Sequence, residues 1–110
     1  MPRLFSKPLQ GSLNLLILKI LSSGPLHGYA ITNRIQEISE DVLQVEEGSL
    51  YPALHRMQQD GLISSEWSVS ETNRGVRFYK LTARGKRELE AETCEWERVN
   101  AAIAKILRFA

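Results

Sequence analysis

Residues 48–63 read GSLYPALHRMQQDGLI, and this stretch decides the fold. Apolar residues recur three and four positions apart along it, which predicts an amphipathic helix whose inward face carries Leu50, Ala53, Leu54 and Met57. Proline is tolerated in the first helical turn, so Pro52 predicts that this helix begins near Gly48 or Ser49. Gly61 is expected to end the helix just after Asp60.

Two helices are expected before this stretch. Ser12 is a good N-cap for a helix over residues 13–22, and a Gly-Pro pair ends that helix. A second amphipathic helix fits residues 29–38. A short extended segment, residues 42–45, then leads to the third helix.

After the third helix the pattern becomes that of β-strands. Residues 62–67 alternate between two sets of side chains, and residues 76–81 are rich in β-branched and aromatic side chains. The segment between them is polar and carries turn-forming residues, so the two strands are predicted to form a β-hairpin with a basic tip. Trp67 is expected to cover the core beneath this hairpin.

A long helix is expected at the end of the sequence. Thr82 can cap a helix over residues 83–108, roughly 39 Å long at about 1.5 Å per residue. An apolar stripe with heptad spacing, imperfect at Glu92, runs along this helix and contains Leu89, Trp96, Val99, Ile103 and Ile106. The stripe is longer than a small domain needs, so it predicts contact with a partner.

The first helix predicts the same kind of contact. Leu15 and Leu18 lie opposite the face formed by its other apolar residues, so the helix is apolar nearly all round. One small domain is expected to cover only one face, which leaves the other face for a second chain. The predicted dimer interface consists of Leu15, Leu18, Leu89, Trp96, Val99, Ile103 and Ile106.

Three helices followed by a hairpin is the order of elements in the winged helix-turn-helix fold. The predicted fold class is therefore mainly α with a small β-hairpin, followed by a long C-terminal dimerisation helix. Residues 1–81 are predicted to form the winged-helix DNA-binding domain and residues 82–110 the dimerisation helix, within one continuous structural unit. In this fold the third helix enters the major groove, while the hairpin, or wing, reaches the DNA backbone or the minor groove.

The distribution of charge and polar groups favours double-stranded DNA as the partner. The net charge is only +1, but residues 37–71 are mainly acidic, whereas residues 72–87 carry basic charges and no acid, as phosphate neutralisation requires. The predicted DNA-binding residues are Ser49, Tyr51, Pro52, His55, Arg56, Gln59, Asn73, Arg74 and Arg77. Tyr51 is equally suited to packing its ring beside the hairpin, and both roles remain open.

Motifs in the right order along residues 21–85 resemble the PadR-like family of bacterial transcription regulators. Residues 21–29, LSSGPLHGY, resemble its GPLHGYxI segment, and residues 48–57, GSLYPALHRM, resemble its GSLYPALxRL recognition helix. Residues 61–67 and 78–85 are similar to its GLIxxxW and YYxLTxxG stretches. The resemblance runs from about Gln10 to Glu90 and is therefore more specific than one short motif.

The resemblance implies a homodimeric, repressor-type regulator of the short subgroup, which has a single C-terminal helix. In this family the first and last helices form the dimer. A two-fold dimer presents two recognition helices to DNA, so the predicted operator is a pseudo-palindrome. The dimer centre of the family can also hold planar aromatic effectors. This implies an effector pocket at Leu15, Leu18 and Trp96.

Other classes of function find less support. The sequence has no Gly-rich phosphate loop, nucleophile motif or metal-ligand spacing, so no enzymatic activity, cofactor or metal site is predicted. The single cysteine, Cys94, excludes an internal disulfide and favours the cytoplasm, and no membrane segment is expected. His27 is interpreted as structural. The alternative is a winged helix that binds a protein partner, which the acidic stretch before the wing would suit.

Overall fold

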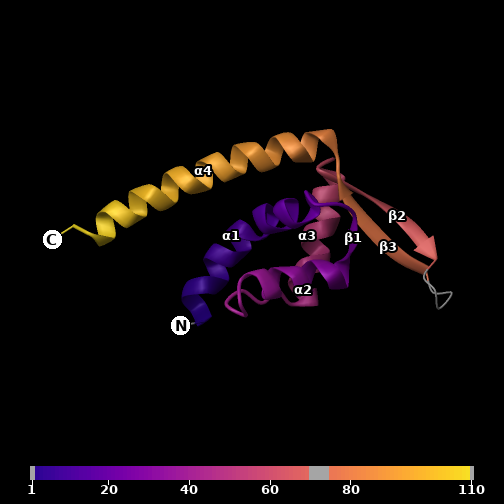
Figure 1. Cartoon of the computed structure of the whole chain (residues 1–110), viewed down its shortest axis with the longest axis horizontal. Coiled ribbons are helices and arrows are strands. Elements are labelled where there is room, and N and C mark those ends of the chain that lie inside the picture. The colour runs from indigo at the N-terminus through magenta and orange to yellow at the C-terminus, as the bar shows by residue number, and fades with distance from the viewer. Residues whose placement is uncertain (1, 70–74, 110) are drawn as a thin grey trace.

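The computed structural model describes the backbone of residues 2–69 and 75–109 and the side chains of residues 12–68 and 75–109. In chain order the elements are α1 (Pro2–Leu21), β1 (Leu26–His27), α2 (Gly28–Ile38), α3 (Glu47–Gln59), β2 (Ile63–Val69), β3 (Gly75–Leu81) and α4 (Ala83–Leu107). The β2–β3 hairpin and the free end of α4 project in opposite directions (Figure 1), so that the molecule measures 60 × 30 × 21 Å. This arrangement confirms the predicted winged-helix fold.

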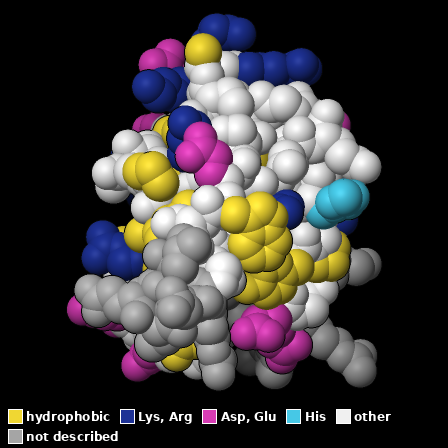
Figure 2. All heavy atoms as spheres, turned by 90° about the vertical axis from the view of Figure 1, so that its right-hand side faces the viewer, with side chains coloured by type: hydrophobic (Ala, Val, Ile, Leu, Met, Phe, Trp, Pro, Cys, Tyr) yellow, Lys and Arg dark blue, Asp and Glu magenta, His cyan; other side chains and the backbone are white. Residues whose placement is uncertain are grey.

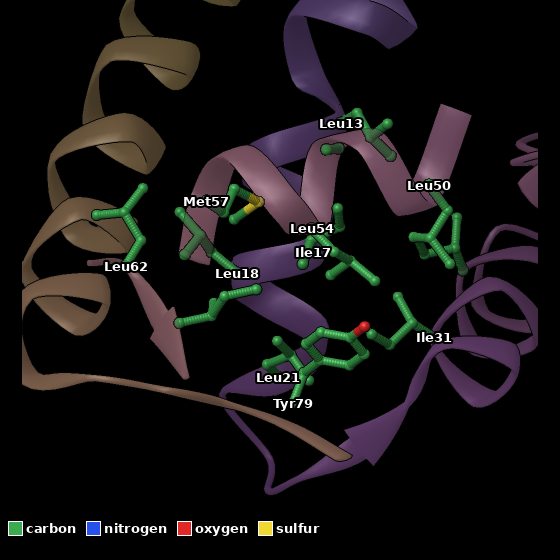
Figure 3. Packing of buried hydrophobic residues seen from close by; sticks show 13 residues of the cluster. Leu13, Ile17, Leu18, Leu21, Ile31, Leu50, Leu54, Met57, Leu62 and Tyr79 are labelled. Carbon is green, nitrogen blue, oxygen red and sulfur yellow. The ribbon is translucent and has the colours of Figure 1, made fainter. Parts of the chain in front are cut away.

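The hydrophobic core lies where α1, α2 and α3 meet the base of the sheet (Figure 3). From the part of α1 whose side chains are described, Leu13, Ile17, Leu18 and Leu21 contribute to it, and Ile17 is completely buried. The inward face predicted for α3 is confirmed, since the buried residues of that helix are Leu50, Ala53, Leu54 and Met57. Packing of this face against α1 leaves the polar face of α3 at the surface.

The sequence predicts Leu18 in the dimer interface and in the effector pocket, and the structure contradicts both placements. Its side chain is 0% exposed and belongs to the core cluster (Figure 3). The prediction assumed that the domain covers α1 on one face only. In the structure β3 and α4 contact α1 in addition to α2 and α3, so the chain itself covers Leu18. Leu15 remains half-buried.

Two helices begin earlier than predicted. α1 begins at Pro2, so Ser12 lies inside the helix and is not its N-cap. A capping side chain marks a helix start only where the residues before it leave the helical conformation, and here they do not. α3 begins at Glu47, which places Pro52 in the second turn rather than the first. There the proline forgoes one helical hydrogen bond without ending the helix.

The remaining helix caps agree with the sequence. The Nδ1 atom of His27 accepts a hydrogen bond from the Ala30 amide at 3.2 Å and caps α2, which confirms the structural interpretation of this histidine. Thr82 Oγ1 accepts a hydrogen bond from the Gly85 amide at 3.0 Å and caps α4, as predicted. Each cap satisfies an amide that the helix leaves unpaired.

The sheet contains one strand that the sequence did not reveal. β1 is two residues long, too short to show an alternating pattern, and pairs with β3 to give the order β1-β3-β2. β2 and β3 form the predicted hairpin, with Ser65 opposite Tyr79 and Trp67 opposite Arg77. Trp67 does not cover the core. It lies on the same face of the hairpin as buried Ile63, but the hairpin runs past the core and leaves Trp67 67% exposed.

Candidate nucleic-acid interface

α3 presents a polar face to solvent because its apolar side chains point into the core. The predicted DNA-binding residues on this helix are all exposed and share one side of it, namely Ser49, Tyr51, Pro52, His55, Arg56 and Gln59. Gln59 Nε2 lies 3.3 Å from His55 Nε2, so the amide and the imidazole are neighbours one turn apart. Both groups keep further donors or acceptors that suit base edges in a major groove.

Tyr51 packs against the start of α2 and also reaches the surface. A Cβ atom at Gly28 would lie 2.6 Å from the Tyr51 hydroxyl oxygen, so only glycine leaves room for the ring at this position. Tyr51 is nevertheless 43% exposed. The ring therefore packs α3 against α2 while the residue remains accessible to solvent.

A hydrogen bond between side chains joins the wing to α3. The Ser65 hydroxyl of β2 donates to Gln58 Oε1 of α3 at 2.9 Å. Farther along the hairpin, the Arg77 guanidinium carbon lies 4.7 Å from the ring centroid of Trp67. The other predicted wing contacts, Asn73 and Arg74, lie outside the described residues.

Charges around this surface are mixed. Glu46 and Glu47 lie at the start of α3, where the helix dipole stabilises acidic side chains. The same carboxylates repel DNA phosphates. Lys80 of the wing pairs with Glu66 at 3.5 Å. Figure 2 looks at the end of the molecule from which the hairpin projects, with basic side chains gathered along the upper edge and a hydrophobic patch open at the centre. Attraction to phosphate therefore comes from local cations and not from the overall charge.

A second surface feature lies between α1 and α4 and is named the α1–α4 groove. It is open, mainly apolar and about 860 Å³ in volume, and its lining residues are Ser12, Leu15, Leu16, Lys19, Leu43, Leu89, Glu90, Thr93, Cys94 and Trp96. Leu15 and Trp96 both line this groove, and Leu18 does not. Leu43 comes from the loop before α3, and helical spacing in the sequence gave no signal for its position.

Glu92 on α4 provides a test of the electrostatics beside the groove. Burial raises the pKa of this carboxyl above 4.5, and a hydrogen bond with Glu88 and the charge of Glu88 raise it further. The ionised form is therefore disfavoured in the folded state, and this penalty disappears as the pH falls through the raised pKa. Glu92→Gln is expected to raise the melting temperature at pH 7 by about 1–3 °C, since solvent screens much of the effect, with a smaller gain near pH 4.5.

Glu95→Gln is the matched control for that experiment. A hydrogen bond from Arg98 and the charge of that residue lower the pKa of the Glu95 carboxyl. Loss of this carboxylate should therefore decrease the melting temperature at neutral pH, and the decrease should fade in acid. Thermal unfolding at several pH values measures both variants. If Glu92→Gln lowers the melting temperature at pH 7, as Glu95→Gln is expected to do, the assignment for Glu92 is wrong.

The described residues contain neither a cluster of three potential metal ligands nor a helix long and apolar enough to cross a membrane. What they do present is an exposed polar helix face held beside a β-hairpin. This geometry places the chain in the winged-helix class of DNA-binding proteins.

The chain belongs to the Transcriptional regulator PadR-like family, whose sequence model matches residues 17–91. It is a DNA-binding transcriptional regulator. A transcriptional regulator from Mycobacterium tuberculosis is 36% identical over 80 residues, which cover 73% of this chain and 71% of that protein. A transcriptional regulator from Clostridium thermocellum has a structure that matches with a TM-score of 0.87 at 27% identity, over 94% of this chain and all of the other.

Bacillus subtilis PadR offers a comparison in the DNA-bound state. Its structure in complex with operator DNA matches with a TM-score of 0.68 at 30% identity, over 74% of this chain. That protein is named a negative transcriptional regulator. The match covers 46% of the PadR chain, so this chain corresponds to less than half of it.

Proposed function

We propose that the chain is a repressor that binds a pseudo-palindromic operator as a homodimer, with residues 1–81 contacting DNA and residues 82–110 pairing the two copies. The observation that carries the proposal is the joint presence of an exposed polar α3 and a projecting α4. The name of Bacillus subtilis PadR as a negative regulator supports the sign of regulation. No enzymatic activity is assigned, and binding to operator DNA implies a location in the cytoplasm.

The exposed side of α4 supports the dimer. α4 extends beyond the other elements (Figure 1), and Trp96, Val99 and Ile103 on its predicted stripe are roughly half-exposed. Ile106 and Leu107 are more exposed still. An isolated helical arm of this kind is only marginally stable in water, and its apolar surface favours burial against a second copy. Leu15 and Leu89 extend the proposed interface toward the body of the domain.

Two recognition helices related by a two-fold axis would meet half-sites about one helical turn apart. The proposed contacts are Ser49, Tyr51, Pro52, His55, Arg56, Gln59, Asn73, Arg74 and Arg77. If the dimer neutralises about six to eight phosphates, the logarithm of the affinity should fall with the logarithm of the salt concentration at a slope of about −5 to −7. Titration of duplex DNA at several salt concentrations measures that slope, and no binding at low salt would overturn the proposal.

Gln59→Ala and Arg77→Ala separate base recognition from backbone contact. Gln59 is exposed on α3 and suited to a base edge, so its loss should weaken binding to the preferred sequence about tenfold or more and leave random DNA little affected. Arg77→Ala should weaken both DNAs alike and flatten the salt slope by about 0.9 for each wing. An equal loss on both DNAs for Gln59→Ala, or a loss confined to the preferred sequence for Arg77→Ala, would contradict these roles.

The α1–α4 groove is the proposed site for a planar aromatic effector. Leu15 and Trp96 lie on its wall, and the Trp96 indole can stack on a flat ring. Such a ligand regulates only if it prefers a dimer with the wrong spacing for DNA, so binding must be coupled to DNA affinity. Titration with a library of aromatic compounds should change tryptophan fluorescence and weaken DNA binding together. If no compound changes the tryptophan fluorescence or the DNA affinity, the proposal of an aromatic effector is wrong.

A protein-binding winged helix is the second candidate function. Glu46 and Glu47 at the start of α3 favour it, because two carboxylates there repel phosphates and would suit a basic protein surface. The DNA titration separates the two functions. DNA binding that strengthens as salt is lowered supports the regulator, whereas a protein that ignores DNA at every salt concentration supports the alternative.

A further inference from the structure

Trp67 and Arg77 form a cross-strand pair on the wing. The two residues are directly opposite each other in the β2–β3 register, and the Arg77 guanidinium carbon lies 4.7 Å from the centroid of the Trp67 ring. This distance is within the range of a cation–π interaction, for which tryptophan is the strongest aromatic partner. The indole is nevertheless mainly exposed, so burial in the core does not explain a tryptophan at this position.

The pair lies on the face of the hairpin that adjoins α3. Side chains alternate between the two faces of a strand, so Trp67 shares a face with Ser65. Ser65 bonds to Gln58 of α3, which fixes the direction in which this face points. The Trp67–Arg77 pair therefore continues the surface of α3 outward along the wing.

The cation on the opposite face of the hairpin, Lys80, is in a different environment. There Lys80 pairs with the carboxylate of Glu66 at 3.5 Å, which offsets its charge. Arg77 instead lies over a neutral ring, which holds the guanidinium in place and leaves its positive charge available to an anion.

Gly75 completes this arrangement. A Cβ atom at Gly75 would lie 3.3 Å from Cε3 of Trp67, closer than nearly all contacts of real Cβ atoms. The absence of a side chain at this position therefore leaves room for the indole beside Arg77.

We propose that Trp67 is a positioning residue for DNA binding, which holds the Arg77 guanidinium so that its N–H groups donate to a backbone phosphate beside the groove entered by α3. The inference rests on the proposed DNA-binding function and extends it to a residue that makes no DNA contact of its own. A guanidinium held in advance loses less conformational freedom on binding a phosphate than a mobile one does. Trp67 thus raises affinity without adding a phosphate contact.

The test is a double-mutant cycle with Trp67→Leu, Arg77→Ala and the double variant, measured on the full protein. The probe is one duplex of about 30 base pairs, enriched by the wild-type protein from random DNA. Trp67→Leu is expected to weaken binding about two- to fivefold for each wing, without changing the salt slope. Arg77→Ala should flatten the slope, and in that background Trp67→Leu should have no further effect.

Two further variants control for folding and position. Trp67→Phe keeps an aromatic face and should lose less affinity for DNA than Trp67→Leu. If the leucine variant unfolds below the assay temperature, the phenylalanine variant replaces it in the cycle. Glu66→Gln, on the other face of the hairpin, should not weaken binding, because it removes a negative charge and releases Lys80.

The possible results separate this inference from the proposed function. Wild-type affinity in Trp67→Leu, or an equal loss with and without Arg77, would overturn the positioning role. A wild-type protein that binds no DNA at all would overturn the proposed function and, with it, the inference.

Discussion

Gly85→Ala is expected to destabilise the fold by about 2–3 kcal/mol and to lower the melting temperature by roughly 10–20 °C. A Cβ atom at this position would lie 2.0 Å from the Leu62 carbonyl oxygen, a collision with backbone and not with a flexible side chain. That carbonyl cannot move freely, because it accepts hydrogen bonds from the Thr82 amide at 3.1 Å and from the Thr82 hydroxyl at 3.0 Å. α4 would have to lift away from the end of α3 and give up part of its cap.

Gly48→Ala is the matched control. Gly48 also lies in a helix, but a Cβ atom there would meet no atom within 4 Å. Alanine has the higher helix propensity, so this substitution should leave stability unchanged or raise it by up to about 1 kcal/mol. Thermal or denaturant unfolding of both variants provides the comparison. If Gly85→Ala proved as stable as Gly48→Ala, the close contact between α4 and Leu62 would be wrong.

Ile103→Asp is expected to convert the protein to monomers and to weaken binding to a two-half-site operator more than about 100-fold. Ile103 is 49% exposed near the middle of the projecting part of α4. In the proposed dimer each copy would bury an unpaired carboxylate at this position, and a two-fold interface carries the penalty twice. Loss of the dimer also removes the gain from two linked half-site contacts. Sedimentation at micromolar concentration and DNA titration measure the two effects.

Ala101→Asp controls for the added charge. Ala101 is exposed and lies two residues away, on the opposite side of α4. This variant should remain dimeric and lose little DNA affinity beyond the small effect of one more negative charge. A dimer that survives Ile103→Asp, or one that both substitutions disrupt equally, would contradict the proposed interface.

Much of the fold could be predicted because local signals agree with the packing. The apolar spacing of residues 50–57, the Thr82 cap and the strand pattern after Gly61 each reappear in the structure. The errors arose where tertiary contacts decide the outcome. Leu18 is buried because other elements surround α1, and Trp67 is exposed because the hairpin outruns the core. Neither fact is contained in the spacing of residues along the chain.

The candidate site shows the same division. The polar face of α3 follows directly from helical periodicity, so its exposed residues could be predicted. The α1–α4 groove could be predicted only in part, because Leu43 reaches it from a loop whose path depends on the whole fold. The pairing of Trp67 with Arg77 depends on the register of the hairpin. Register follows from the length of the turn, and the sequence pattern does not fix where each strand ends.

Selection of bound sequences from random double-stranded DNA tests the central claim most directly. The claim is that α3 and the wing bind specific DNA, and that α4 sets two copies at a fixed separation. The account predicts an enriched pseudo-palindrome with half-sites about one helical turn apart, and loss of base preference within each half-site for Gln59→Ala. A pool that remains random after repeated selection at low salt, or that yields a single unpaired half-site, would contradict it.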